Sequence, residues 1–169
     1  MLRSRFKRSA LGTAGALTAL LAAFAGTTGP AQAAPAAATV TTAAGQTLVA
    51  PSAPSLQDRA RLAAVSPTVS PAARFGHVPA DSDYQCAQGN LCALVWDPTA
   101  GDYKIFYLYN CARYSLSGWN GQGFYADNQT GGVRSYFYGS NGGVLKSFTP
   151  DGGANHTQDW TPVYAIRNC

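Results

Sequence analysis

The sequence contains no glutamate, and only 12% of its residues are charged. All eight acidic residues are aspartate, which favours turns over helix interiors. A soluble protein usually has about 25% charged residues. Coiled coils, helical bundles and charged disordered tails all need more charged or helix-favouring side chains than this chain supplies. We therefore exclude these three classes.

The excess of positive charge is confined to the N-terminus. The formal net charge is +4, but Arg3, Arg5, Lys7 and Arg8 all lie in the first eight residues. The rest of the chain has eight basic residues against eight aspartates. A balanced chain lacks the electrostatic footprint of a nucleic-acid or membrane-surface protein, so we expect neither kind of partner.

Residues 1–33 have the three parts of a secretory signal peptide: a basic start, an apolar stretch over residues 9–26, and the small-residue sequence Ala31-Gln32-Ala33. Glycine and threonine interrupt the apolar stretch, which suits removal better than a membrane span of about 20 residues. A signal anchor is the alternative. We predict cleavage after Ala33 or Ala34 and a secreted, extracellular protein.

Residues 34–81 are rich in alanine, proline and threonine. They hold six of the ten prolines and a single aromatic residue, Phe75. Such a composition buries little apolar surface against the entropy of the chain, so we predict a flexible linker or a pro-segment. Residues 55–62 can form two helical turns with Ser55 as the cap, but an isolated helix of that length is marginal in water.

The sequence from residue 82 onward has the composition of a folded β domain. Residues 84–169 hold 16 of the 19 aromatic residues and all four cysteines. Short alternating runs separated by glycine, asparagine and aspartate predict an all-β sandwich or barrel. We expect strands over residues 91–96, 103–111, 133–138, 144–148 and 163–167, a bend at 121–125, and one helical turn around 112–116.

Four cysteines in a small exported domain predict two disulfides. Three pairings are possible, and we choose Cys86–Cys92 and Cys111–Cys169. The first closes a tight loop through Gly89, and the second ties Cys169 to the middle of the domain. A zinc site is the alternative, but the spacing contains no C-x-x-C motif.

Catalytic side chains are scarce in the predicted domain. Its one histidine is His156, and no G-x-S-x-G motif is present. A triad of serine, His156 and aspartate is the catalytic alternative to a solvated histidine. Glycoside hydrolysis would need two facing carboxylates, whereas most aspartates here lie in turn sequences. We therefore predict a binding protein and not an enzyme.

Tyrosines form the strongest remaining pattern. In two of the expected strands they alternate with apolar residues, so one set should form the core and the other should face water. Exposed tyrosines favour contact with a partner or a sugar, and the alternative is that they line the edges of the core. The alternating residues are Tyr107, Tyr109, Tyr136 and Tyr138 against Phe106, Leu108 and Phe137.

Residues 84–169 resemble the βγ-crystallin fold. More closely, they are similar to secreted bacterial proteins of a peptidase inhibitor family typified by a small metalloproteinase inhibitor. The likeness is carried by the C-x5-C loop with Gly-Asn-Leu-Cys, by the segment NC-x-x-YSLSGW (residues 110–119), and by the final cysteine. It implies one disulfide-stapled domain over residues 82–169, with two Greek-key motifs packed as a sandwich.

The same resemblance implies a monomeric inhibitor of a secreted protease, acting through a rigid convex loop. We expect that loop at residues 97–102, 139–143 or 150–158. A secreted antimicrobial or cell-wall polysaccharide-binding protein, using exposed aromatic residues beside Arg134 and Lys146, is the alternative. The candidate contact residues are Asp97, Gly101, Asp102, Asn141, Gly142, Asp151 and His156.

Calcium-binding crystallin-type domains carry the motif [N/D]-[N/D]-x-x-[S/T]-S, whose oxygens suit a hard cation. Asp127 and Asn128 supply the leading pair, but Gly131 stands at the first hydroxyl position. The corresponding second segment, residues 160–165, has no acidic residue. We therefore expect no cofactor, with a weak calcium site at Asp127 and Asn128 as the alternative.

Overall fold

The computed structural model describes residues 46–169, which fold into an all-β domain with one short helix, α1 (Leu56–Arg61). The predicted signal peptide lies outside these residues. No helix within them is long and apolar enough to cross a membrane. The strands are β1 (Gln46–Val49), β2 (Thr68–Ser70), β3 (Arg74–Val78), β4 (Asp83–Cys86), β5 (Leu91–Asp97), β6 (Asp102–Leu108), β7 (Arg113–Ser117), β8 (Gln122–Asp127), β9 (Ser135–Tyr138), β10 (Val144–Phe148), β11 (Asn155–Asp159) and β12 (Ala165–Arg167).

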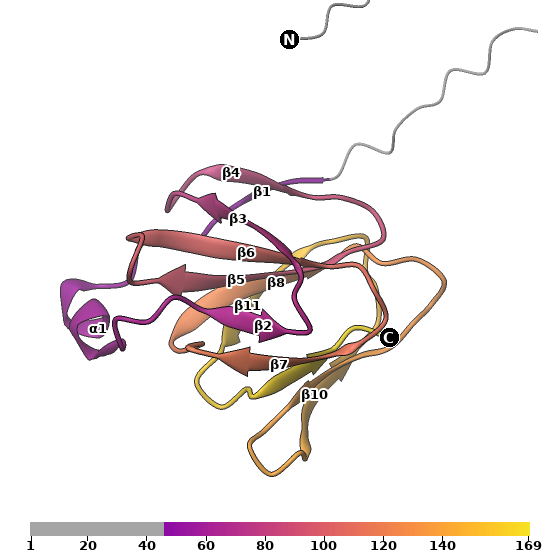
Figure 1. Cartoon of the computed structure of the whole chain (residues 1–169). Coiled ribbons are helices and arrows are strands. Elements are labelled where there is room, and N and C mark those ends of the chain that lie inside the picture. Colours follow the sequence, from indigo (N-terminus) through magenta and orange to yellow (C-terminus); the bar gives the residue numbers. More distant parts are fainter. Residues whose placement is uncertain (1–45) are drawn as a thin grey trace, which may run out of the picture. The chain divides into compact units, whose positions relative to one another are not determined.

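Two five-stranded antiparallel sheets form the sandwich (Figure 1). We call the sheet with the order β10-β9-β12-β7-β2 sheet 1, and the sheet with the order β11-β8-β5-β6-β3 sheet 2. A two-stranded ribbon, β1-β4, lies beyond sheet 2 and makes a third layer. The prediction of an all-β sandwich is confirmed.

The strand β5 is the middle strand of sheet 2, and all seven of its residues are buried. Its side chains alternate between two cores, as the period of a strand requires. Leu91, Ala93 and Val95 belong to the core between the sheets, which also contains Tyr114, Phe137, Trp160 and Ile166. Cys92, Leu94 and Trp96 belong to a second core on the other side of sheet 2.

The second core corrects the prediction of a flexible linker over residues 34–81. From residue 46 onward this segment is part of the fold. Leu48, Ala50 and Val78 are buried against sheet 2. The strand β2 extends sheet 1 along β7, and β3 extends sheet 2 along β6. The segment has few apolar side chains of its own, but the domain that follows presents an apolar face for them to cover.

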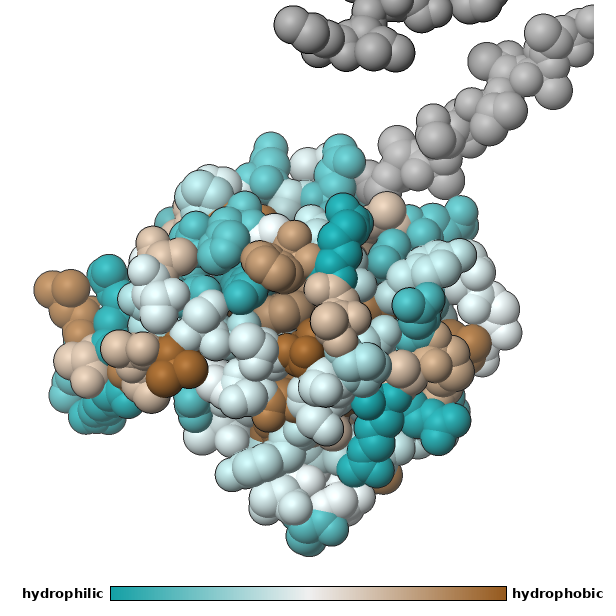
Figure 2. Space-filling view, viewed as in Figure 1, coloured by the Kyte–Doolittle hydropathy of each residue, from teal (hydrophilic) through white to brown (hydrophobic). Residues whose placement is uncertain are grey.

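The helix α1 forms within residues 55–62, where the sequence allows two helical turns but the segment was predicted to be a flexible linker. The Ser55 hydroxyl oxygen caps the helix by accepting a hydrogen bond from the Asp58 N–H at 3.1 Å. No residue of α1 is buried, and Leu56 is 78% exposed. Figure 2 shows apolar side chains at this projecting end of the molecule.

Two local predictions were wrong. Residues 121–125 were expected to bend, but only Gly121 does so, and residues 122–125 lie in β8 because Gly123 serves a close approach and not a turn. A Cβ atom at Gly123 would lie 2.1 Å from the Leu94 carbonyl oxygen and 2.5 Å from Trp160 Nε1. Residues 112–116 were expected to form a helical turn, yet β7 pairs with β12 on one side and β2 on the other.

Both predicted disulfides are formed. Cys86 and Cys92 lie 5.9 Å apart between Cα atoms, and Cys111 and Cys169 lie 5.4 Å apart. There is no free cysteine among the described residues. The two bonds indicate an oxidising environment.

Candidate functional site

The predicted contact residues lie in three separate parts of the sandwich. Asp97, Gly101 and Asp102 belong to the hairpin between β5 and β6, and Asn141 and Gly142 to the hairpin between β9 and β10. Asp151 precedes β11, and His156 lies on β11. Residues 150–158 are therefore not one loop, since residues 155–159 form a strand.

Asp97 stabilises its hairpin from beneath. It is 1% exposed, and its carboxylate accepts hydrogen bonds from Thr99 N at 2.9 Å, Thr99 Oγ1 at 2.6 Å and Ser66 Oγ. Lys104 Nζ donates to the same Ser66 hydroxyl at 3.0 Å. Burial raises the pKa of Asp97, but the hydrogen bonds from Ser66 and Thr99 outweigh it, and the pKa lies below its ordinary value. Asp97 thus joins the N-terminal segment to the sandwich.

The other predicted contact residues in the hairpins also have structural roles. Asn141 Oδ1 accepts from Gly143 N at 2.9 Å, and Gly142 has a φ of +77°. This backbone conformation favours glycine. Asp102 Oδ1 lies 2.8 Å from His77 Nδ1.

His156 and Asp151 form an exposed pair. His156 Nε2 lies 2.5 Å from Asp151 Oδ2, and the imidazole stacks on Tyr125 with ring centroids 4.9 Å apart. Asp151 Oδ1 also accepts from the N–H groups of Gly153 and Ala154. Within residues 46–169, no serine hydroxyl is hydrogen-bonded to His156, so the structure does not bring together the three groups of a triad there.

Asp127 and Asn128 have different neighbours. Asp127 is 1% exposed, and its oxygens accept from Gln129 N at 3.3 Å and Ser135 Oγ at 3.5 Å. Burial raises the pKa of Asp127 to about 6, with a further contribution from Asp151. Asn128 Nδ2 donates to the Cys86 carbonyl. Residues 46–169 contain no cluster of three metal-ligating side chains. The expectation of no cofactor, with weak calcium binding at Asp127 and Asn128 as the alternative, stays a prediction.

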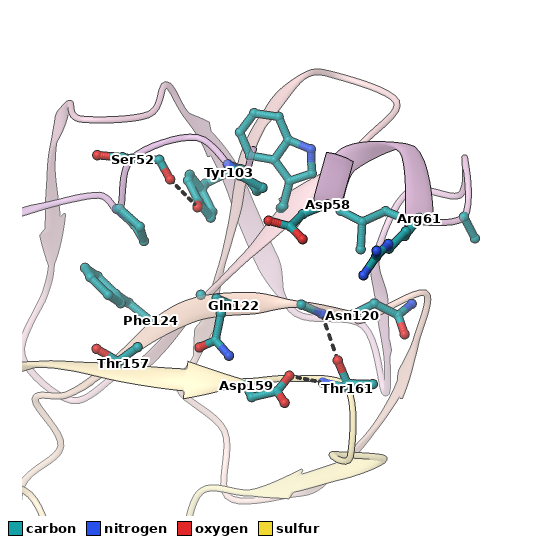
Figure 3. A pocket seen from close by; sticks show the side chains of 17 residues that line it. Ser52, Asp58, Arg61, Tyr103, Asn120, Gln122, Phe124, Thr157, Asp159 and Thr161 are labelled. Carbon is teal, nitrogen blue, oxygen red and sulfur yellow. Dashed lines mark hydrogen bonds between the residues drawn. The ribbon is translucent and has the colours of Figure 1, made fainter. Parts of the chain in front are cut away.

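The feature that sequence reasoning missed is a pocket of about 770 Å³ on the outer face of sheet 2. The strands β8 and β11 form its floor, and residues 51–63 form the opposite wall (Figure 3). Asp58 and Arg61 project from α1 on one side, and Gln122 and Asp159 lie across from them. The size falls within the ~300–1,000 Å³ of typical small-molecule sites.

Three aromatic side chains line the pocket: Trp96, Tyr103 and Phe124. The Tyr103 hydroxyl donates to the Ser52 carbonyl at 2.9 Å and so holds the wall against sheet 2. Burial raises the pKa of Tyr103 to about 12, with a smaller contribution from Asp81. The phenol is therefore neutral and remains a donor at physiological pH.

Several polar side chains that line the pocket are free to hydrogen-bond a ligand. Asn120, Gln122 and Thr157 line it, and none of their side chains makes a hydrogen bond to another residue in the described part of the chain. Asp159 Oδ1 accepts from Thr161 N at 3.0 Å. The charged lining groups have mixed signs: Asp58 and Asp159 against Arg61.

Trp96 is unusual because its indole N–H is buried without a partner. Among residues 46–169 it is the one buried side-chain nitrogen or oxygen that lacks a hydrogen bond. The guanidinium carbon of Arg59 lies 5.6 Å from the Trp96 ring centroid. Local sequence patterns could not reveal this pocket, because one wall comes from the segment that its composition assigned to a linker.

Comparisons with family models, with curated proteins and with solved structures find no match to this chain. The resemblance to a peptidase inhibitor family therefore stays a prediction.

Proposed function

We propose that the sandwich is βγ-crystallin-like, with two Greek-key motifs. The exchange of one strand between the two sheets supports this. In the first set of four strands, β5, β6 and β8 lie in sheet 2, while β7 lies in sheet 1. In the second set, β9, β10 and β12 lie in sheet 1, while β11 lies in sheet 2. Each set thus gives its third strand to the other sheet.

We further propose that the protein is an exported, monomeric binding protein that holds a neutral oligosaccharide in the pocket on sheet 2. The observation that carries this proposal is the combination of aromatic surfaces with uncommitted amide and hydroxyl groups in one pocket. The predicted signal peptide and the two disulfides support export.

The chemistry of the lining favours a sugar over an apolar or strongly charged ligand. A sugar ring has an apolar face that packs on an aromatic side chain, and its hydroxyl groups both donate and accept hydrogen bonds. Gln122 and Asn120 offer both kinds of group, and Thr157 adds a hydroxyl. Charges of both signs at the rim give no strong preference for an anion or a cation.

Calorimetric titration with chitotriose and cellotriose tests this function. Gln122→Ala should weaken binding about tenfold, as expected for the loss of hydrogen bonds worth about 1.4 kcal/mol. Gln85→Ala is the matched control, because Gln85 is also an exposed strand glutamine but lies on β4, outside the pocket lining. It should bind like the wild type. No binding of either sugar at millimolar concentration would reject the proposal.

Protease inhibition is a second candidate, favoured by the rigid β5–β6 hairpin. Thr99, Ala100 and Gly101 are exposed at its tip, while Asp97 anchors its base. Preorganisation of this kind reduces the entropy lost on binding. Stoichiometric loss of activity of a thermolysin-like protease would support it. If metallo- and serine proteases keep full activity in the presence of this protein at micromolar concentration, protease inhibition is rejected.

A further inference from the structure

The outer face of sheet 1 combines tyrosine and arginine side chains. In β9, β12 and β7 the inward side chains Phe137, Ile166 and Tyr114 are buried in the core. The alternate residues therefore point outward, as the period of a strand requires. We call these outward residues the Tyr/Arg face: Tyr136, Tyr138, Arg167 and Arg113, with Arg134 beside them on the sequence before β9.

The register places these side chains in a row. Tyr136 pairs with Arg167, and Arg167 pairs with Arg113 on the next strand. Neighbouring strands lie about 4.8 Å apart, so Arg167 and Arg113 occupy adjacent positions on one face of the sheet. In the next row, Ala165 lies between Tyr138 and Ser115. The small side chain of Ala165 leaves room for Arg113 to reach Tyr138, where its guanidinium carbon lies 4.1 Å from the ring centroid.

The charged side chains on this face all carry the same sign. No aspartate lies on the five strands of sheet 1. In the described part of the chain the close contacts between a basic side chain and an aspartate are His77–Asp102 and His156–Asp151, so no arginine there is neutralised by an aspartate. Arg134 Nη1 donates to Ser147 Oγ at 3.3 Å, and Arg167 Nε donates to the Cys169 oxygen at 2.9 Å. Most of the guanidinium N–H groups thus remain free.

We propose that the Tyr/Arg face binds an acidic polysaccharide that carries carboxylate groups on its sugar rings. The planar guanidinium group matches a carboxylate with two parallel hydrogen bonds. Contact with Tyr138 holds Arg113 in place and lowers the entropy that binding would cost. The tyrosine hydroxyls of Tyr136 and Tyr138 add hydrogen-bonding groups for the sugar.

Charge density favours such a polymer over nucleic acid. Double-stranded DNA carries one charge per about 1.7 Å and requires many phosphate contacts. This face offers three arginines, and the eight aspartates elsewhere balance the charge of residues 46–169. A polymer with one carboxylate on each sugar ring matches a short row of cations better.

Retention on immobilised polygalacturonate at low salt tests the proposal. The wild type should be retained and should elute as salt rises, because screening weakens contacts between exposed charges. Arg113→Gln should lower the affinity about tenfold. Arg74→Gln is the matched control: Arg74 is also exposed, and its guanidinium carbon lies 3.8 Å from the Tyr107 ring centroid, but it is on sheet 2. It should be retained like the wild type.

Three results would overturn the proposal: no retention at low salt, equal weakening by Arg113→Gln and Arg74→Gln, or tighter binding to DNA or to a phosphate-rich polymer than to polygalacturonate. Equal melting temperatures of the two variants show that folding is not the cause of a difference. Gln122→Ala should be retained normally, so the outcome is independent of the pocket on sheet 2.

Discussion

The hydroxyl of Ser66 joins two buried charged residues, and its removal should destabilise the domain. Ser66 Oγ donates to Asp97 Oδ2 and accepts from Lys104 Nζ. Asp97 is 1% exposed and Lys104 is 7% exposed. Ser66→Ala leaves both charged groups without this bridge. A hydrogen bond to a charged group contributes about 1.5–3 kcal/mol, so we expect the free energy of unfolding to fall by about 2–4 kcal/mol.

Urea unfolding followed by tryptophan fluorescence measures this loss. Ser117→Ala is the control, because Ser117 is exposed on β7 and its side chain makes no hydrogen bond to another residue in the described range. It should stay within about 0.5 kcal/mol of the wild type. A similarly small effect of Ser66→Ala would refute the view that the Ser66 hydroxyl stabilises the fold by joining Asp97 and Lys104.

The low pKa of Asp97 predicts how this contribution depends on pH. A carboxyl whose pKa is lower in the folded than in the unfolded state stabilises the fold above the unfolded value of about 3.9. That stability is lost as the pH falls through the folded pKa. Acid should therefore narrow the difference in stability between the wild type and Ser66→Ala.

Three further predictions concern stability. The pKa of Asp127 is raised to about 6 by burial, against about 3.9 in the unfolded chain. Its contribution is therefore full below about pH 4 and is lost as the pH rises through about 6. Between pH 4 and pH 7 the wild type should lose about 2 kcal/mol of stability relative to Asp127→Asn, and an unchanged difference in urea unfolding would contradict this. Gly123→Ala should lower the free energy of unfolding by at least about 3 kcal/mol, because the new Cβ atom would overlap the Leu94 carbonyl. Gly76→Ala is the control: its Cβ would lie no closer than 3.6 Å to a neighbour, so this variant should fold normally. Replacing Cys111 and Cys169 by serine should lower the free energy of unfolding by about 4 kcal/mol, and replacing Cys86 and Cys92 should lower it by about 2 kcal/mol. The difference follows from the lengths of the two closed loops, since the sequence separations are 58 and 6. An equal loss of melting temperature in the two variants would contradict this reasoning.

The sequence predicted the sandwich, the disulfides and the alternation of buried and water-facing side chains along the tyrosine-rich strands because these features depend on local alternation and on residue type. Phe137 is buried, while Tyr136 and Tyr138 on either side of it are partly exposed. Ser55 before a short apolar and charged run indicated two possible helical turns at α1, although the segment as a whole was assigned to a linker. Apart from the Cys111–Cys169 pairing, which joins residues 58 positions apart, each of these signals lies within a few residues of the feature that it predicts.

The pocket could not be predicted because it depends on contacts between distant segments. The Tyr103 hydroxyl reaches the Ser52 carbonyl across 51 positions of the chain. Leu48 and Ala50 are buried only because β5 and β6 present an apolar face. The composition of residues 34–81 shows how many apolar side chains the segment has. It does not show that the following domain presents an apolar face against which these side chains can be buried.

The most direct test of the proposed function is to follow the three indole N–H resonances by NMR during titration with chitotriose. Trp119 and Trp160 donate to the carbonyls of Thr68 and Leu94, whereas Trp96 lines the pocket without a partner. A bound sugar should shift the Trp96 resonance more than the other two. No shift of Trp96 at millimolar sugar, or equal shifts of all three resonances, would contradict binding in this pocket.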